Sequence, residues 1–169
     1  MNRRGFTIVE LLIVIALMGI LLTLSVANLR GTQVSSRDTE RKIDVDTIAS
    51  QLEIFYKVGT DNSTVLGRYP STAEANGSAN IQASFRDADL KSFTPPGATS
   101  ADTGFVMATN NTQTTSGVAP QPTTSTYVYQ PLQQDGSLCS LSSQACTKFN
   151  LYYKLETDGL VYMKTSKNQ

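Results

Sequence analysis

The chain has 169 residues, of which 17% are charged, and its formal net charge at neutral pH is zero. This length suffices for one long helix and one globular domain, and the charge balance points neither to nucleic acid nor to an acidic partner. Histidine, the commonest general base and zinc ligand, is absent from the sequence. No nucleophile has a base at motif spacing, so we expect a protein that is not an enzyme and has no metal or cofactor.

The N-terminal region is apolar. Residues 11–29 contain no charged side chain over 19 positions, and about 20 residues are needed for a helix to cross a bilayer. Arg3 and Arg4 precede this run. By the positive-inside rule, the N-terminus would lie in the cytoplasm and everything after Arg30 outside it. We expect a single-pass segment of the cytoplasmic membrane.

The helix is expected to continue past this span. Apolar residues recur at helical spacing, at Val45, Ile48, Leu52 and Phe55. Charged residues of mixed sign at positions 37–46 predict a solvated helix face with ion pairs such as Arg41 to Asp44. Lys57 and Gly59 match the end of a helix. We therefore expect one helix over residues 6–58, apolar over residues 6–29 and amphipathic over residues 30–58.

Residues 59–169 are rich in Ser, Thr, Asn and Gly and predict a strand-rich domain. Strands are expected at residues 105–108, 127–130, 149–156 and 160–164. Asp158 and Gly159 predict a two-residue hairpin turn between the last two strands. Residues 109–126 offer almost nothing to bury, so we expect an exposed, mobile loop. The expected fold class is α+β: a long N-terminal helix packed on a small antiparallel sheet.

The chain begins with MNRRGFTIVELL. This segment resembles the type III signal of type IV pilins and of type II secretion pseudopilins. In that family a prepilin peptidase cuts after the glycine and methylates the new N-terminal phenylalanine. The resemblance implies a leader peptide at residues 1–5, cleavage between Gly5 and Phe6, and N-methylation of Phe6. It also makes Glu10 the acidic residue of the family signal.

Glu10 lies four residues after Phe6, on the same face of the expected helix. A charge inside a membrane helix costs about 2.5–3.5 kcal/mol or more, so an intramembrane glutamate suggests a function. Cleavage would create a positive amine on Phe6. In a filament, the amine of one subunit would neutralise Glu10 of its neighbour, which assigns subunit assembly to this pair.

The resemblance implies a structural subunit of an extracellular type IV pilus, used for adhesion, surface motility or DNA uptake. The subunit would rest in the cytoplasmic membrane in contact with lipid and then polymerise into a helical homo-oligomer at the cell surface. The implied partners are the prepilin peptidase and methylase, the membrane platform and the assembly ATPase. Nucleic acid would be met only indirectly, through DNA uptake.

Three alternatives remain. The chain could be a pseudopilin of a type II secretion or competence system, although major secretion pseudopilins usually have a tryptophan-containing calcium loop and this sequence has no tryptophan. It could also be a monomeric membrane-anchored or secreted binding protein. Finally, Ser25, Val26 and Ala27 form a small-x-small site for ordinary signal peptidase. Against that last alternative, the helical pattern continues past Ala27.

Cys139 and Cys146 are the only cysteines. We expect them to form a disulfide because the domain would lie outside the cell; two free buried thiols are the alternative. Asp61 and Asp135 each begin a turn-like triplet that resembles a calcium loop, but both triplets have too few ligands. Turns are therefore the preferred interpretation of both.

Overall fold

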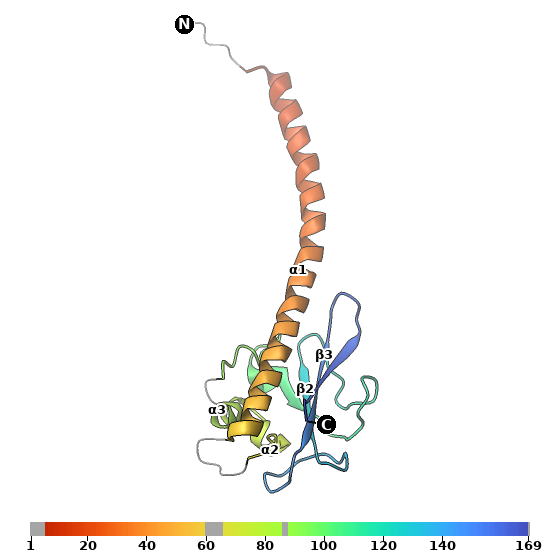
Figure 1. The fold of residues 1–169 in the computed structure, drawn as a ribbon. Coiled ribbons are helices and arrows are strands. Elements are labelled where there is room, and N and C mark those ends of the chain that lie inside the picture. Colours follow the sequence, from red (N-terminus) through yellow and green to blue (C-terminus); the bar gives the residue numbers. More distant parts are fainter. Residues whose placement is uncertain (1–5, 60–65, 86–87, 169) are drawn as a thin grey trace. The chain divides into compact units, whose positions relative to one another are not determined.

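The computed structural model of the chain describes residues 6–59, 66–85 and 88–168, and for residues 25–30 it describes the backbone alone. Residues 1–5, the expected leader with Gly5, lie outside the described residues. The chain divides into two compact units, Met1–Ser36 and Arg37–Gln169. Helix α1 (Ile8–Val58, 51 residues) contributes to both units (Figure 1).

Helix α1 ends as its sequence predicts. Lys57 lies in the last turn. Gly59 follows with a φ of 70°, and its N–H donates to the Phe55 carbonyl at 2.7 Å. A left-handed residue at this position satisfies a carbonyl at the helix end, and glycine adopts that conformation without strain.

In the unit Met1–Ser36, the described apolar side chains of α1 up to Leu24 are exposed. Within the described part of the chain, no helix has both the length and the apolar character that crossing a membrane requires. The expected span, residues 11–29, includes positions whose side chains are not described, among them Ala27 of the alternative cleavage site. A single-pass topology therefore stays a proposal.

The sheet has four strands in the order β1-β2-β3-β4. They are β1 (Phe105–Met107), β2 (Tyr127–Leu132), β3 (Lys148–Lys154) and β4 (Val161–Thr165). Strands β2, β3 and β4 pair antiparallel, as expected, but β1 pairs parallel to β2. The α+β class is confirmed and the sheet is mixed. The 19 residues at positions 108–126 are long enough for the crossover that a parallel pair needs.

The main core lies between α1 and one face of the sheet. Helix α1 contributes Val45, Ile48, Leu52 and Phe55, each at most 3% exposed, and the predicted inward face is confirmed. The sheet contributes large side chains at alternate positions: Tyr127, Tyr129, Phe149 and Leu151. Each buried aliphatic or aromatic side chain stabilises the fold by about 1.5–3 kcal/mol, so this helix–sheet contact is the main source of cohesion in the unit.

The opposite face of the sheet is also covered. Val118 packs there on Ala108, Val128 and Tyr152 in a second cluster. The expectation of a free loop at residues 109–126 is therefore wrong for part of the segment. Residues 111–116 are exposed, as expected, but the segment is fixed at both ends.

Buried Gln130 in β2 anchors this segment. Its side-chain N–H groups donate to the carbonyls of Asn110 (2.8 Å) and Thr112 (3.2 Å). Its side-chain oxygen accepts from the Asn150 amide and the Tyr152 hydroxyl, each at 3.0 Å. A buried side-chain amide is stable when all of its hydrogen bonds are formed. The hydrogen bonds of Gln130 therefore hold the segment at residues 109–126, which has few apolar side chains to pack.

Three short helices precede the first strand: α2 (Thr72–Ala75), α3 (Ser78–Ser84) and α4 (Ala101–Gly104). The sequence suggested a short helical turn at residues 85–93, but none of the three helices lies there. Helix α2 begins with a capping box in which Ser71 caps the N–H of Glu74 and Glu74 returns to the N–H of Ser71. This Ser-x-x-Glu pattern was readable in the sequence and was missed.

The connection from β3 to β4 also differs from expectation. Leu155 and Leu160 close it with a hydrogen bond of 3.1 Å, so it is a six-residue loop and not a two-residue turn. Gly159 has the expected positive φ of 68°. The extra residues, Glu156 and Thr157 among them, bind α1.

Candidate functional site

The predicted assembly residues lie at the start of α1: Phe6 precedes the helix and Glu10 is in its first turn. Phe6 is 87% exposed, and Gly5, the other side of the expected cleavage site, lies outside the described residues. Thr7 and Glu10 form a capping box: the Thr7 N–H and hydroxyl donate to Glu10 Oε2 at 3.0 and 2.9 Å, and the Glu10 N–H donates to the Thr7 hydroxyl at 3.2 Å. Glu10 thus has a structural role in the single chain, in addition to its proposed role in assembly.

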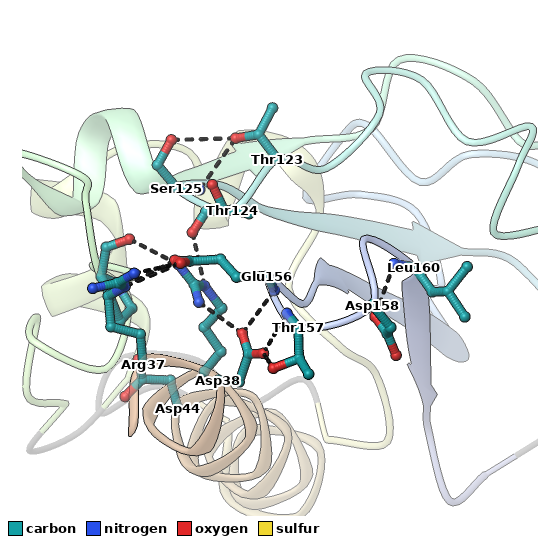
Figure 2. Close-up of polar contacts among 12 residues, drawn as sticks. Arg37, Asp38, Asp44, Thr123, Thr124, Ser125, Glu156, Thr157, Asp158 and Leu160 are labelled. Atoms are coloured by element: carbon teal, nitrogen blue, oxygen red, sulfur yellow. Dashed lines mark hydrogen bonds and ion pairs between the residues drawn. The ribbon is translucent and has the colours of Figure 1, made fainter. Parts of the chain in front are cut away.

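A buried ionic cluster joins α1 to the β3–β4 loop, at the start of the unit Arg37–Gln169 (Figure 2). The Arg41 side chain is 1% exposed. It donates to Asp38 at 2.9 Å and to Glu156 at 2.5 Å. It also donates to the carbonyls of Thr124 (2.8 Å) and Pro96 (3.2 Å). One guanidinium therefore binds four acceptors, which suits its planar fork of donors.

Asp38 completes the cluster. It accepts from the backbone N–H groups of Glu156 (2.8 Å) and Thr157 (2.9 Å) and from the Thr157 hydroxyl (2.5 Å). Burial alone would raise the pKa of Asp38, but these bonds and the bond from Arg41 outweigh burial and lower it to about 2. Arg37 donates to Glu156 at 2.5–3.2 Å, and this contact lowers the Glu156 pKa.

Asp44 is buried one turn further along α1. Its carboxylate accepts from the Tyr127 hydroxyl at 2.9 Å. Burial raises the pKa of Asp44 to about 6, against the lowering effect of the Tyr127 bond. The expected solvated face is present at Glu40, Lys42 and Asp46, which are exposed, but the expectation is wrong for the buried positions 38, 41 and 44. Arg41 binds Asp38 and Glu156 in place of the expected partner Asp44. Positions 38, 41 and 44 lie on the core-facing side of the helix, in line with Val45 and Ile48.

The two cysteines are joined. Cys139 and Cys146 form a disulfide with their Cα atoms 5.6 Å apart, and both are fully buried. The carbonyls of these cysteines accept from the N–H groups of Thr72 and Tyr69, at 3.0 and 2.7 Å. The bridged segment is thus attached to the chain that leads into α2.

In the part of the chain that the structure describes, no cluster of three or more His, Cys, Asp or Glu is placed to hold a metal ion. Asp135 accepts from the N–H and the hydroxyl of Ser137, at 2.9 and 2.7 Å, which is a local turn. Asp61, the other candidate calcium residue, lies outside the described residues. The polar groups described above bind one another, and their arrangement supports a structural role.

Residues 1–26 match the prokaryotic N-terminal methylation motif. The N-terminal segment is a prepilin-type methylation signal. The chain is 37% identical over 76 residues to the type II secretion system core protein G of Dickeya chrysanthemi, which is 45% of each chain. It is 38% identical over 73 residues to that of Klebsiella michiganensis (43% of this chain, 46% of the relative). It is 36% identical over 73 residues to that of Pectobacterium carotovorum (43% and 42%).

The match to each curated relative thus spans less than half of that relative's length. No solved structure is significantly similar to the chain. A prepilin-type signal and a relationship to pseudopilins support a pilin-like structural protein and not an enzyme. The relatives are pseudopilins, so the comparisons favour the pseudopilin alternative over the type IV pilus that was first expected.

Proposed function

We propose that the chain is a pilin-like filament subunit of the pseudopilin type, assembled by a type II secretion system or a closely related machine. The observation that carries this proposal is the methylation signal at residues 1–26 together with the similarity to type II secretion system core protein G. The exposed apolar side chains of the first part of α1 support it, because they need either lipid or other helices to cover them.

In the proposed sequence of events, the precursor is held in the cytoplasmic membrane by residues 11–29. The prepilin peptidase cuts between Gly5 and Phe6, and the Phe6 amine is methylated. The subunit then leaves the membrane and its apolar helix enters the filament core. Here the positive amine of Phe6 in one subunit meets Glu10 of its neighbour.

The hydrogen bonds in the first turn of α1 are compatible with this pairing of Glu10 with the Phe6 amine of a neighbouring subunit. Both bonds from Thr7 go to Oε2 of Glu10. In the described residues of the single chain, no donor reaches Oε1 of Glu10, which leaves this oxygen to accept from an amine on another subunit. A paired charge in an apolar core costs far less than a lone one.

A type IV pilus subunit is the second candidate. Two observations favour it: the sequence has no tryptophan, and the described residues hold no metal-ligating cluster. The tryptophan-containing calcium loop usual in major secretion pseudopilins therefore has no counterpart in the sequence.

Gene deletion and complementation would separate the two candidates. A pseudopilin predicts loss of protein export while any surface fibres and surface movement persist. A pilus subunit predicts the reverse. Normal export together with normal surface fibres in the deletion strain would contradict both.

Intact mass of the membrane and filament pools tests the processing. The mature chain should begin at Phe6 and carry one N-methyl group. A chain that begins near Asn28 would have lost the helix needed for polymerisation, and the filament proposal would be wrong.

A further inference from the structure

Strand β4 forms one edge of the sheet, and its register shows which of its backbone groups are used. The Leu155 N–H donates to the Leu160 carbonyl at 3.1 Å, and the Ser166 N–H donates to the Phe149 carbonyl at 3.0 Å. In an antiparallel ladder, the residues that bond to the neighbouring strand alternate with residues whose groups point away. Positions 160, 162, 164 and 166 therefore bond to β3.

The remaining positions of β4 point their backbone groups outward. These are Val161, Met163 and Thr165, each of which pairs with β3 only as a non-hydrogen-bonded partner. Among the described residues, no partner binds the N–H or carbonyl of these three. The edge thus presents three free donors and three free acceptors at the spacing of a β-strand, which is a template for one further strand.

Clefts lie on both faces of the sheet beside this edge. On the face toward α1, a cleft of about 210 Å³ is lined by Lys164, Thr165 and Lys167 and, from α1, by Asp46 and Glu53. On the opposite face, a cleft of about 150 Å³ includes Lys148 and Met163. An added strand directs its side chains alternately to these two faces, so the clefts lie where such side chains would go.

A shallower cleft of about 460 Å³ on the same side as Lys148 includes Gly159, Leu160 and Val161. Leu160 is 59% exposed and Met163 39% exposed. Met163 thus gives an occupant an apolar side chain to contact on this face, beside polar residues such as Thr115, Ser116 and Gln121.

The charges beside the edge indicate a further feature of the occupant. Lys164 is paired with Asp46 at 2.9 Å. Glu53 accepts from the Tyr69 hydroxyl and from the Lys167 N–H, at 3.0 and 2.9 Å. Among the described residues, no carboxylate pairs with the ammonium groups of Lys148 and Lys167. Lys148 lines a cleft without a carboxylate and would attract an acidic side chain of an occupant, whereas Asp46 and Glu53 balance the charges of Lys164 and Lys167 in the cleft toward α1.

We propose that the open edge of β4 binds an extended peptide segment of another protein, carrying apolar and acidic side chains, as an added fifth strand. Backbone bonds to Val161, Met163 and Thr165 supply the affinity, and the clefts supply the selectivity. All of the groups that this proposal uses lie in the unit Arg37–Gln169.

The test uses the full chain in detergent micelles and a short synthetic peptide of alternating valine and glutamate. Residue-resolved amide exchange should slow about tenfold or more at Met163 and Thr165 when the peptide is added, since those amides become bonded. The same peptide with N-methyl groups on alternate amides should not protect them. A peptide with lysine in place of glutamate should bind more weakly.

The matched protein variants are Met163→Pro and Met163→Ala. Proline removes an outward N–H and leaves the bonds to β3 intact, so the sheet should keep its fold. Met163→Pro should lose binding about tenfold or more, and Met163→Ala should change it about threefold or less.

Three results would overturn the proposal. In the first, the peptide protects no amide of β4, which would mean that the lysines merely block pairing at the edge. In the second, peptide binding survives N-methylation. In the third, the β4 amides become protected at high protein concentration without any peptide, which would assign the edge to a second copy of this chain.

Discussion

Arg41 carries a charge into the interface between α1 and the β3–β4 loop. Replacing it with alanine would leave the buried carboxylate of Asp38 without its cation, while Glu156 keeps Arg37 as a partner. Removing one partner of a buried ion pair typically costs about 3–5 kcal/mol. We therefore expect Arg41→Ala to lower the free energy of unfolding of the unit Arg37–Gln169 by roughly that amount. Denaturant unfolding of the full chain in detergent, followed by the near-UV circular dichroism of its tyrosines, measures the change.

Lys164→Ala is the matched control, because Lys164 and Asp46 form an ion pair whose side chains are 50% and 67% exposed. Exposed pairs contribute about 0–1 kcal/mol. If Arg41→Ala and Lys164→Ala lowered the free energy of unfolding by the same amount, the buried ionic cluster would stabilise the fold no more than an exposed ion pair does.

Asp44 should make stability depend on pH in the opposite sense to Asp38. The pKa of Asp44 is raised to about 6 in the folded chain from an ordinary value of 3.8. Its stabilising contribution is therefore complete below about pH 4 and is lost as the pH rises through 6. Asp38, whose pKa is lowered to about 2, contributes above pH 4 and is lost in stronger acid.

The variant Asp44→Asn keeps an acceptor for the Tyr127 hydroxyl and cannot ionise. We expect it to be more stable than the natural chain at pH 7 by on the order of 1 kcal/mol, after allowance for solvent screening of the charge. The difference should shrink as the pH falls from 7 to 4. Unfolding curves across this range test the claim, and a difference that does not change with pH would contradict it.

At the scale of elements, Gln130 determines how the segment at residues 109–126 is held. Gln130→Met preserves the size of the side chain but removes both donors from the carbonyls of Asn110 and Thr112. It also leaves the Asn150 amide without its acceptor. We expect a loss of about 1–3 kcal/mol and faster proteolysis within residues 111–116. Limited proteolysis followed by mass spectrometry is the measurement, with Gln113→Met, on the exposed loop, as control; equal cleavage rates would show that Gln130 does not anchor the segment.

Periodicity predicted the elements whose packing follows a simple pattern. The apolar positions of α1 and its glycine end were visible in the sequence, as was the alternation of Phe149, Leu151 and Tyr153 in β3. The antiparallel pairing of β3 with β4 also followed from sequence, although the connecting loop is longer than Asp158 and Gly159 suggested.

Other features depend on contacts between distant positions. Arg41 has a favourable local partner at Asp44, and only the folded chain brings Glu156, Thr124 and Pro96 to it. The parallel pairing of β1 and the cover over the outer sheet face likewise arise from residues far apart in sequence. The capping box that starts at Ser71 is a different case, since its Ser-x-x-Glu signal is local and could have been found in the sequence.

At the scale of the whole molecule, the N-terminal signal is the most informative segment. Processing, membrane insertion and filament assembly are all proposed to depend on it. Glu10 is the residue at which these roles meet. In the single chain it caps α1 through Thr7. In the proposed filament it also pairs with the amine of Phe6 on the neighbouring subunit.

Replacing Glu10 with alanine separates these roles. Insertion should be at least as good as before, because an intramembrane charge is removed. Cleavage should continue, because the proposed cut after Gly5 lies away from the substituted position. Loss of the cap costs the isolated helix only about 1 kcal/mol, whereas an unpaired amine in an apolar core costs several. Asp135→Ala, which removes an exposed acid from the other unit, is the control.

The most direct measurement is therefore the ratio of assembled filament to processed membrane pool in a Glu10→Ala strain with the chain overproduced. We predict a normal pool of cleaved subunit with little or no filament for Glu10→Ala, and normal assembly for Asp135→Ala. A filament yield from Glu10→Ala equal to that of the natural chain would contradict the proposed pairing of Glu10 with Phe6.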